Sequence, residues 1–272
     1  MPDCTRCGRE LPLYSFHKIC QPCRTQMAQY ARNEDSTPVP RLTDADAKAY
    51  VTTGLMAINV IVFLAMIFSG DSPLDPSGQT LIRFGSTKGM HSLFFEQWRL
   101  LTSTFVHGGI LHIAINMWCL WDLGGLAERI FDRWIYFLIY IGSGVAGMMA
   151  AAWWNPRTVT VGASGAIFGI VGALITALYL GKLPIDRHAI QSTLRSVLIF
   201  AGFSLFWGVA VSSNVSNAAH IGGLVSGLAL GAILAPSLTW STGKRQLWAL
   251  LIFAVAAIIF SGTLLYLKRL VS

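Results

Sequence analysis

The sequence predicts an all-α polytopic membrane protein with a small polar module at its N-terminus. Of its 272 residues, 54% are hydrophobic and only 12% are charged, whereas soluble domains carry about 25% charged residues. Seven apolar stretches each have the roughly 20 residues that a helix needs to cross the hydrocarbon of a bilayer. The first 50 residues hold 13 of the 33 charged side chains, which indicates a polar head on a membrane-embedded body.

Four segments follow from this pattern. Residues 1–30 are expected to form a cytoplasmic four-cysteine module, and residues 31–50, which are rich in proline and charge, a linker. Residues 51–235 are expected to form a core of six transmembrane helices, and residues 236–272 a loop and an extra transmembrane helix. The polar beginning of the sequence does not resemble a signal peptide, which favours a cytoplasmic head.

The predicted spans are residues 51–69, 109–126, 134–154, 161–180, 194–212, 217–235 and 247–267. The connection Gly70–Val106 is much longer than the others and contains aromatic and amphipathic segments around Trp98 and Arg99. We expect a partly folded loop lying in the membrane interface, the alternative being a plain connector with an aromatic anchor.

The distribution of basic residues predicts the orientation. With a cytoplasmic head, 14 of the 20 Lys and Arg residues fall in inside segments and 6 in outside segments. Positive charge accumulates on the cytoplasmic side of membrane proteins, so the N-terminus is expected inside and the C-terminus outside. The bases form no dense tract, and we therefore expect no nucleic-acid partner despite a formal net charge of +7.

Four of the five cysteines form two C-x-x-C pairs, Cys4 with Cys7 and Cys20 with Cys23. This spacing is typical of a zinc site with four thiolate ligands. Two disulfides or a redox-active pair are the alternatives. A cytoplasmic head argues against lasting disulfides, and no βαβ pattern accompanies the cysteines, as it would in a redox-active pair. A module this small folds around its metal, and four protein ligands leave no open position, so the expected Zn²⁺ is structural and not catalytic.

Polar residues gather at corresponding ends of the second, fourth and sixth spans. His112 and Asn116 lie four residues apart and hence on one helical face, Ser164 begins the fourth span, and His220 lies near the start of the sixth. The predicted orientation places all four at a similar depth near the outer leaflet. Glycines spaced four apart follow the serine and the histidine, which permits close helix approach; they are Gly165, Gly169, Gly223, Gly227 and Gly231.

Close approach of the fourth and sixth spans would bring Ser164 within reach of His220. A neutral histidine activates a serine nucleophile as its general base, and His112, Asn116 and the Ser164 amide are suitable donors for an oxyanion. Each residue also has an ordinary interpretation. The serine could serve packing, a membrane histidine could be a metal ligand or a proton relay, and the asparagine could join helices. The combination favours acyl-transfer chemistry.

The same residues resemble the rhomboid family of intramembrane serine proteases. The matching segments are Trp98-Arg99, HGGILHIAIN with His107, His112 and Asn116, GASGAIFG with Ser164, and AHIGGLVSG with His220, in the family's order across residues 51–235. The resemblance implies a six-helix bundle in which Ser164 is the nucleophile, His220 the general base and acid, and His112 and Asn116 the oxyanion donors. It implies no catalytic cofactor, no acidic third member, and single-span transmembrane protein substrates.

One departure concerns Phe168, because family members often carry tyrosine four residues after the serine, stacked on the histidine. We expect the phenylalanine ring to stack while the hydroxyl group is lost. The rival hypotheses are a catalytically silent relative that binds transmembrane clients and a metal or proton transporter. Ser164 and His220, the two residues that catalysis requires, are both present, which argues against a silent relative. Asp122 and Glu128 lie far along the span from the histidines, which argues against a transporter. We expect a multi-pass protein of a bacterial inner (plasma) membrane, whose head recruits a cytoplasmic partner.

Overall fold

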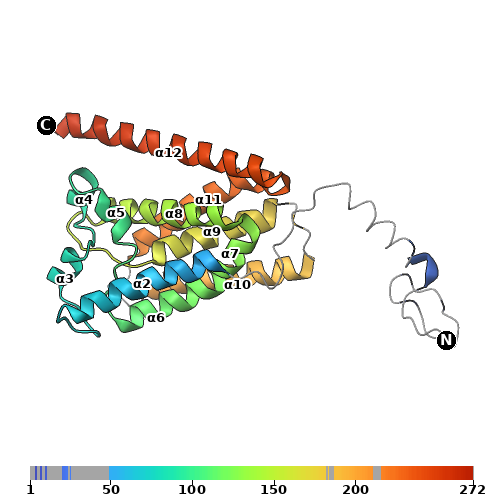
Figure 1. Ribbon diagram of the computed structural model, residues 1–272, viewed down its shortest axis with the longest axis horizontal. Coiled ribbons are helices and arrows are strands. Elements are labelled where there is room, and N and C mark those ends of the chain that lie inside the picture. Colours follow the sequence, from blue (N-terminus) through green and yellow to red (C-terminus); the bar gives the residue numbers. More distant parts are fainter. Residues whose placement is uncertain are drawn as a thin grey trace. The chain divides into compact units, whose positions relative to one another are not determined.

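The computed structural model describes residues 4, 7, 10, 20–23, 25, 49–181, 183, 187–210 and 216–271, and its regular elements are all helices. The chain divides into two units, Met1–Pro40 and Arg41–Ser272. The elements of the second unit are α2 (Tyr50–Phe68), α3 (Gly78–Arg83), α4 (Met90–Phe94), α5 (Trp98–Thr102), α6 (Ile110–Cys119), η1 (Leu120–Gly124), α7 (Gly125–Phe131), α8 (Arg133–Trp154), α9 (Ser164–Leu180), α10 (Arg187–Ala210), α11 (Asn217–Leu234), η2 (Ala235–Thr239) and α12 (Thr242–Val271) (Figure 1).

Helices occupy all seven places at which the sequence predicts a transmembrane span. Five stretches in the described part of the chain are long and apolar enough to cross a membrane: Tyr50–Phe68, Ile110–Phe131, Arg133–Trp154, Asn217–Thr239 and Thr242–Thr263. The helices α9 and α10 contribute shorter apolar segments. The all-α polytopic architecture is therefore confirmed, although α9 begins three residues later than expected, at Ser164.

The second span is a continuous helix with a change of pitch. Five residues, Leu120–Gly124, form a π-helical turn between α6 and α7. Beyond it, the buried carboxylate of Glu128 accepts hydrogen bonds from the backbone N–H groups of Val51 and Thr52, at 3.0 and 2.9 Å, and from the Thr52 hydroxyl at 2.9 Å. The first amides of a helix lack intrahelical acceptors, so this glutamate caps α2 and ties the first span to the second.

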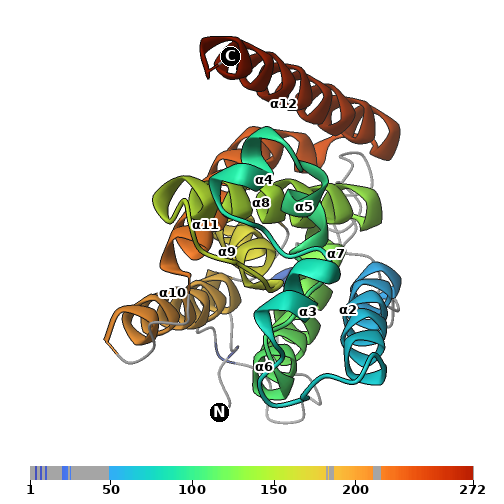
Figure 2. The ribbon, with the colours of Figure 1, turned by 90° about the vertical axis from the view of Figure 1, so that its left-hand side faces the viewer.

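The centre of the bundle is built on glycine. A methyl group added to Gly223 would overlap the carbonyl oxygen of Gly165, and one added to Gly227 would overlap that of Gly169. The backbones of α9 and α11 therefore touch, as the glycine spacing predicts. In Figure 2, α9 lies in the middle of the bundle, and it contacts α6, α8, α10 and α11.

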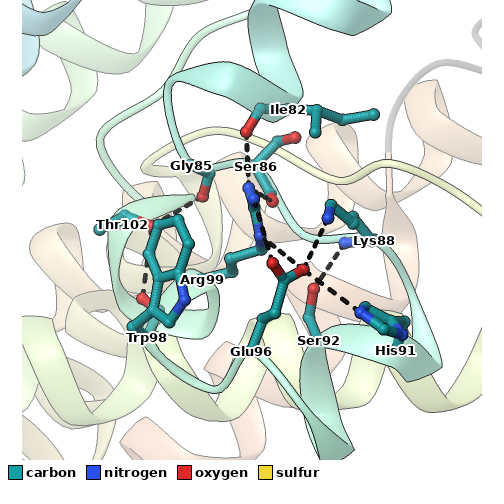
Figure 3. Close-up of polar contacts among 10 residues, drawn as sticks. All are labelled: Ile82, Gly85, Ser86, Lys88, His91, Ser92, Glu96, Trp98, Arg99 and Thr102. Carbon is teal, nitrogen blue, oxygen red and sulfur yellow. Dashed lines mark hydrogen bonds and ion pairs between the residues drawn. The ribbon is translucent and has the colours of Figure 1, made fainter.

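The long connection after α2 is folded, as expected. It contains α3, α4 and α5, held together by the guanidinium group of Arg99, which is largely buried. This group donates to the carbonyl oxygens of Ile82 and Ser86, at 2.6 and 3.2 Å, and to the carboxylate of Glu96 at 2.9 Å (Figure 3). Because two backbone carbonyls and one carboxylate bind the same side chain, Arg99 fixes the shape of the loop.

Candidate active site

Ser164 is the first residue of α9 and follows residues 158–162, which belong to no helix. The chain enters the helix through Gly162, whose φ of +116° lies where side chains are strained. The Gly162 amide donates to the Ser103 carbonyl at 2.9 Å, which fixes the turn. Since the first N–H groups of a helix have no intrahelical acceptor, the Ser164 amide faces outward from the helix beginning.

His220 lies in the first turn of α11 and is only 6% exposed. Its ring is stacked on Phe168 of α9, with 4.3 Å between ring centroids and 7° between planes. The expected stacking of phenylalanine is thus confirmed. The Nδ1 atom is buried and has no hydrogen-bond partner among the described residues, so the stack, rather than an acidic side chain, orients this imidazole.

The helices α9 and α11 are in contact beside Ser164 and His220, through Gly165, Ala219 and Gly223. A Cβ atom added to Gly165 would lie 3.4 Å from the Ala219 carbonyl oxygen, and one added to Gly223 would collide with Gly165. No hydrogen bond joins the serine hydroxyl to the histidine in the part of the chain that is described. Catalytic hydrogen bonds often tighten only when substrate binds.

His112 faces the turn that precedes Ser164. A Cβ atom at Gly162 would lie 2.7 Å from His112 Nε2, so only glycine leaves room for the ring. The Gly108 amide donates to His112 Nδ1 at 3.4 Å. A neutral imidazole that accepts at Nδ1 carries its proton on Nε2, and His112 therefore presents a donor beside the serine turn.

Asn116 lies one turn further along α6 and is 5% exposed. Its Nδ2 group donates to the His112 carbonyl at 2.9 Å. An amide nitrogen carries two hydrogens, and this bond to its own helix uses one of them. The bond holds the side chain on the same helical face as His112, as the spacing of four residues predicts.

His107 received no role from the sequence, although it belongs to the matching motif. Its ring is fully buried and meets that of His112 edge to face, with centroids 5.1 Å apart. Burial lowers the pKa of His107 to about 3, so its ring is neutral at physiological pH. The feature that could have indicated this contact is the spacing of His107 and His112, with four residues between them, ahead of Asn116.

A second feature that the sequence did not reveal is a set of hydrogen bonds between the folded loop (residues 70–106) and the serine turn, the residues 156–163 that lead into Ser164. Thr87 donates from its amide to the Thr160 carbonyl at 3.2 Å, and its hydroxyl accepts from the Thr160 amide at 3.0 Å. The Met90 amide donates to the Pro156 carbonyl at 2.9 Å. These contacts join residues more than 60 positions apart, which no local pattern in the sequence reveals.

The contacts with the loop leave some backbone groups of residues 158–162 without a hydrogen bond. Thr160 is committed to Thr87 through both backbone groups, whereas the N–H and C=O groups of Val159 and Val161 make no hydrogen bond within the described residues. Unpaired backbone donors and acceptors therefore lie directly before Ser164.

The loop beside this segment carries a charged cluster. Glu96 Oε2 lies 2.7 Å from Lys88 Nζ, 2.9 Å from Arg99 Nε and 3.5 Å from His91 Nε2 (Figure 3). Hydrogen bonds from Lys88 and from Arg99 hold the pKa of Glu96 below its usual range. The carboxylate is thus ionised wherever the loop is folded at neutral pH.

In the N-terminal unit, the four predicted ligands lie together. The sulfur atoms of Cys4, Cys7, Cys20 and Cys23 all lie within 4.8 Å of one another. The Cys7 and Cys20 sulfurs are 3.6 Å apart, close to the roughly 3.8 Å edge of a tetrahedron with Zn–S bonds of about 2.3 Å. None of the four forms a disulfide, and the donor set fits a four-coordinate metal ion.

Comparisons with protein families and with individual known proteins all find rhomboid proteins. The Rhomboid domain matches residues 95–237. Rhomboid protease GluP of Bacillus subtilis (strain 168) is 34% identical over 211 residues, 78% of this chain and 40% of that protein's length. Rhomboid protease AarA of Providencia stuartii is 30% identical over 68% of this chain and 73% of its own length.

RHOMBOID-like protein 7 of Arabidopsis thaliana is 27% identical over 75% of this chain and 72% of its own length. The chain spans less than half of the Bacillus protein but most of the other two. The matched domain covers a little over half of the 272 residues and includes the serine turn, α11 and the His112 face of α6. The chain belongs to the rhomboid family.

Proposed function

We propose that this protein is an intramembrane serine protease that cleaves transmembrane proteins through Ser164 and His220. The observation that carries the proposal is the arrangement of Ser164 at the beginning of α9, against the turn of α11 in which His220 stacks on Phe168. The family relationship and the named proteases among the relatives support it.

In the proposed reaction, Ser164 Oγ attacks the carbonyl carbon of the scissile peptide bond while His220 takes the hydroxyl proton. Because His220 Nδ1 is buried, Nε2 is the nitrogen assigned to this transfer. Collapse of the tetrahedral intermediate breaks the C–N bond, and His220 returns the proton to the leaving amine. Water, deprotonated by the same histidine, then attacks the acyl carbon, the ester bond to Ser164 Oγ breaks, and His220 returns the proton to that oxygen.

The negative oxygen of both intermediates requires donors already in place. We assign this role to the Ser164 amide, His112 Nε2–H and the second N–H of Asn116. The Gly108 bond supports the tautomer that His112 needs, and the bond to the His112 carbonyl supports the orientation of Asn116. A neutral His112 donates without placing a fixed positive charge in a membrane site.

We further propose that the substrate binds as an extended strand along residues 158–162. The free backbone groups of Val159 and Val161 suit addition of a strand to an exposed edge. A transmembrane helix cannot pair in this way, since its own backbone groups are satisfied internally. Cleavage therefore requires local unwinding of the substrate, which favours single-span segments with weak helical ends.

For the membrane arrangement we propose an N-terminus inside, a C-terminus outside and a site near the outer leaflet of a bacterial inner membrane. The unequal distribution of Lys and Arg supports this orientation. A membrane-impermeant thiol label is expected to react from outside with cysteines introduced between 70 and 106. It should reach one introduced at Lys182 only from inside, and the reverse pattern would contradict the orientation.

In the head, we propose that Cys4, Cys7, Cys20 and Cys23 hold one structural Zn²⁺. Metal binding would provide the folding energy of a unit that has too few apolar residues to fold alone. The head shares no ligand with the proposed catalytic residues, and we propose that it recruits a cytoplasmic partner or a substrate's cytoplasmic tail.

The proposal is tested by cleavage of a single-span substrate by the full chain in proteoliposomes. Ser164→Ala and His220→Ala should each lower kcat by about 10⁴- to 10⁶-fold, because each removes a reacting group. The matched controls are Ser226→Ala, a serine of α11 that bonds its own helix, and His91→Ala, an exposed histidine of the folded loop. Both should retain activity, and substantial turnover by either dyad variant would refute the assignment.

A further inference from the structure

The helix α12 lies outside the matched domain, and most of its surface contacts no other part of the described chain (Figure 1). One stripe differs. Ala249 is fully buried, and Phe253 and Phe260 are half-buried, whereas Val255 and Ile259 are exposed. Spacings of four and seven residues place Ala249, Phe253 and Phe260 on one helical face, which is the face that α12 turns toward the bundle.

The beginning of α12 is fixed to the beginning of α8. Arg245 Nη2 lies 3.1 Å from Asp132 Oδ2, and both side chains are largely buried. Asp132 also caps α8 by accepting from the Trp134 amide at 3.2 Å. The indole N–H of Trp248 donates to the Ile233 carbonyl at 3.3 Å. A buried ion pair in which one partner is a helix cap gives the contact a single register.

Further along, the two phenylalanines contact different parts of the bundle. A Cβ atom at Gly142 would lie 2.7 Å from Phe253 Cε1, so the ring occupies the space that glycine leaves on α8. Phe260 packs against a cluster formed by Leu93 of α4, Leu100 of α5 and Met148 of α8. This cluster joins the folded loop to α8, and α12 covers it from outside.

The opposite side of α8 contacts Gly165 and Ala219, which are adjacent in sequence to Ser164 and His220. A Cβ atom at Gly147 would lie 2.7 Å from the Ala219 carbonyl oxygen and 3.3 Å from Gly165 Cα. Gly147 directly precedes Met148 in the sequence. The helix α8 therefore stands between α12 on one side and the turns that carry Ser164 and His220 on the other.

From these contacts we infer that Phe253 and Phe260 are positioning residues, through which α12 braces α8 and the folded loop and so holds Ser164 and His220 in register. The loop transmits its position to the serine turn through Thr87 and Thr160, and α8 transmits its position through Gly147. The inference rests on the proposed protease function, because its consequence is a change in turnover. It assigns a role to a helix that the family match does not include.

The test compares Phe253→Ala and Phe260→Ala with Val255→Ala and Ile259→Ala, which shorten exposed side chains of the same helix. The full chain is used in proteoliposomes at a temperature well below unfolding. We expect each phenylalanine variant to lower kcat by about 10- to 100-fold, since a displacement of about 1 Å can cost about 10²-fold, with KM changed less than about twofold. Amide exchange in peptides covering residues 87–100 should become faster, and the controls should match the wild type.

A merely structural role would lower the yield of folded protein without lowering kcat per folded molecule. If Phe260→Ala does not fold, Phe260→Leu provides the graded variant, with a smaller loss expected in both readouts. Unchanged kcat and exchange in folded phenylalanine variants would overturn the inference, as would equal losses in Ile259→Ala. A wild type without activity would contradict the proposed function instead, and the exchange measurement alone would then decide the inference.

Discussion

Replacing Phe168 tests how the histidine is oriented without a carboxylate partner. Phe168 and His220 are stacked at 4.3 Å, and the free ring nitrogen Nδ1 has no partner in the described structure. Aromatic stacking contributes about 0.5–1.5 kcal/mol beyond burial. If that energy holds the base in its reactive orientation, its loss in Phe168→Leu lowers kcat by about 2- to 12-fold, with KM nearly unchanged.

The matched control is Phe131→Leu, which makes the same change at a fully buried residue of α7 in the same hydrophobic core. Both variants lose similar apolar contact, but only one touches the histidine. The assay is kcat and KM for a single-span substrate in proteoliposomes, together with thermal unfolding. Full kcat in Phe168→Leu, or an equal loss in the control, would refute the reasoning, whereas Phe168→Tyr should retain activity because its ring still stacks.

The oxyanion donors, the loop carboxylate and the cysteine site each give a further prediction. His112→Ala and Asn116→Ala should each lower kcat by about 10²- to 10³-fold, as removal of one oxyanion donor does, and an unaffected double variant would exclude that role. The lowered pKa of Glu96 means that its stabilisation is complete above the unfolded-state pKa, near 4.3, and is lost as pH falls through the lower folded value. Glu96→Gln should therefore unfold at a lower temperature than the wild type at pH 7 and at the same temperature at strongly acid pH; a difference that persists in acid would contradict this. Elemental analysis should find about one zinc per chain, released when the four cysteines are replaced by serine while labelling of Ser164 persists, and zinc-free native protein would refute the metal site.

Much of the fold was predictable because its determinants are local. Apolar runs of about 20 residues set the seven helices, and the spacing of four between Gly223 and Gly227 predicted the close contact of α11 with α9. The four cysteines were likewise recognisable from two short spacings. Each of these signals lies within a single predicted helix or a short stretch of the sequence.

The remaining features depend on partners far apart in the sequence. In the sequence Glu128 is only an acidic residue near the end of a span. Its role as the cap of α2 depends on Val51, which lies 77 positions away in the chain. The positive φ of Gly162 and the mutual bonds of Thr87 and Thr160 have no periodic signature. The stripe on α12 was also hidden, because Phe260 differs from its apolar neighbours only in what it touches.

The most direct test of the central claim is the site of covalent modification by a serine-directed fluorophosphonate. We expect the full chain in membranes to gain one adduct, which peptide mass spectrometry should locate on Ser164. Labelling should be lost in His220→Ala, because the serine is then no longer activated, and retained in Ser226→Ala. An adduct on another residue, or undiminished labelling without His220, would contradict the account.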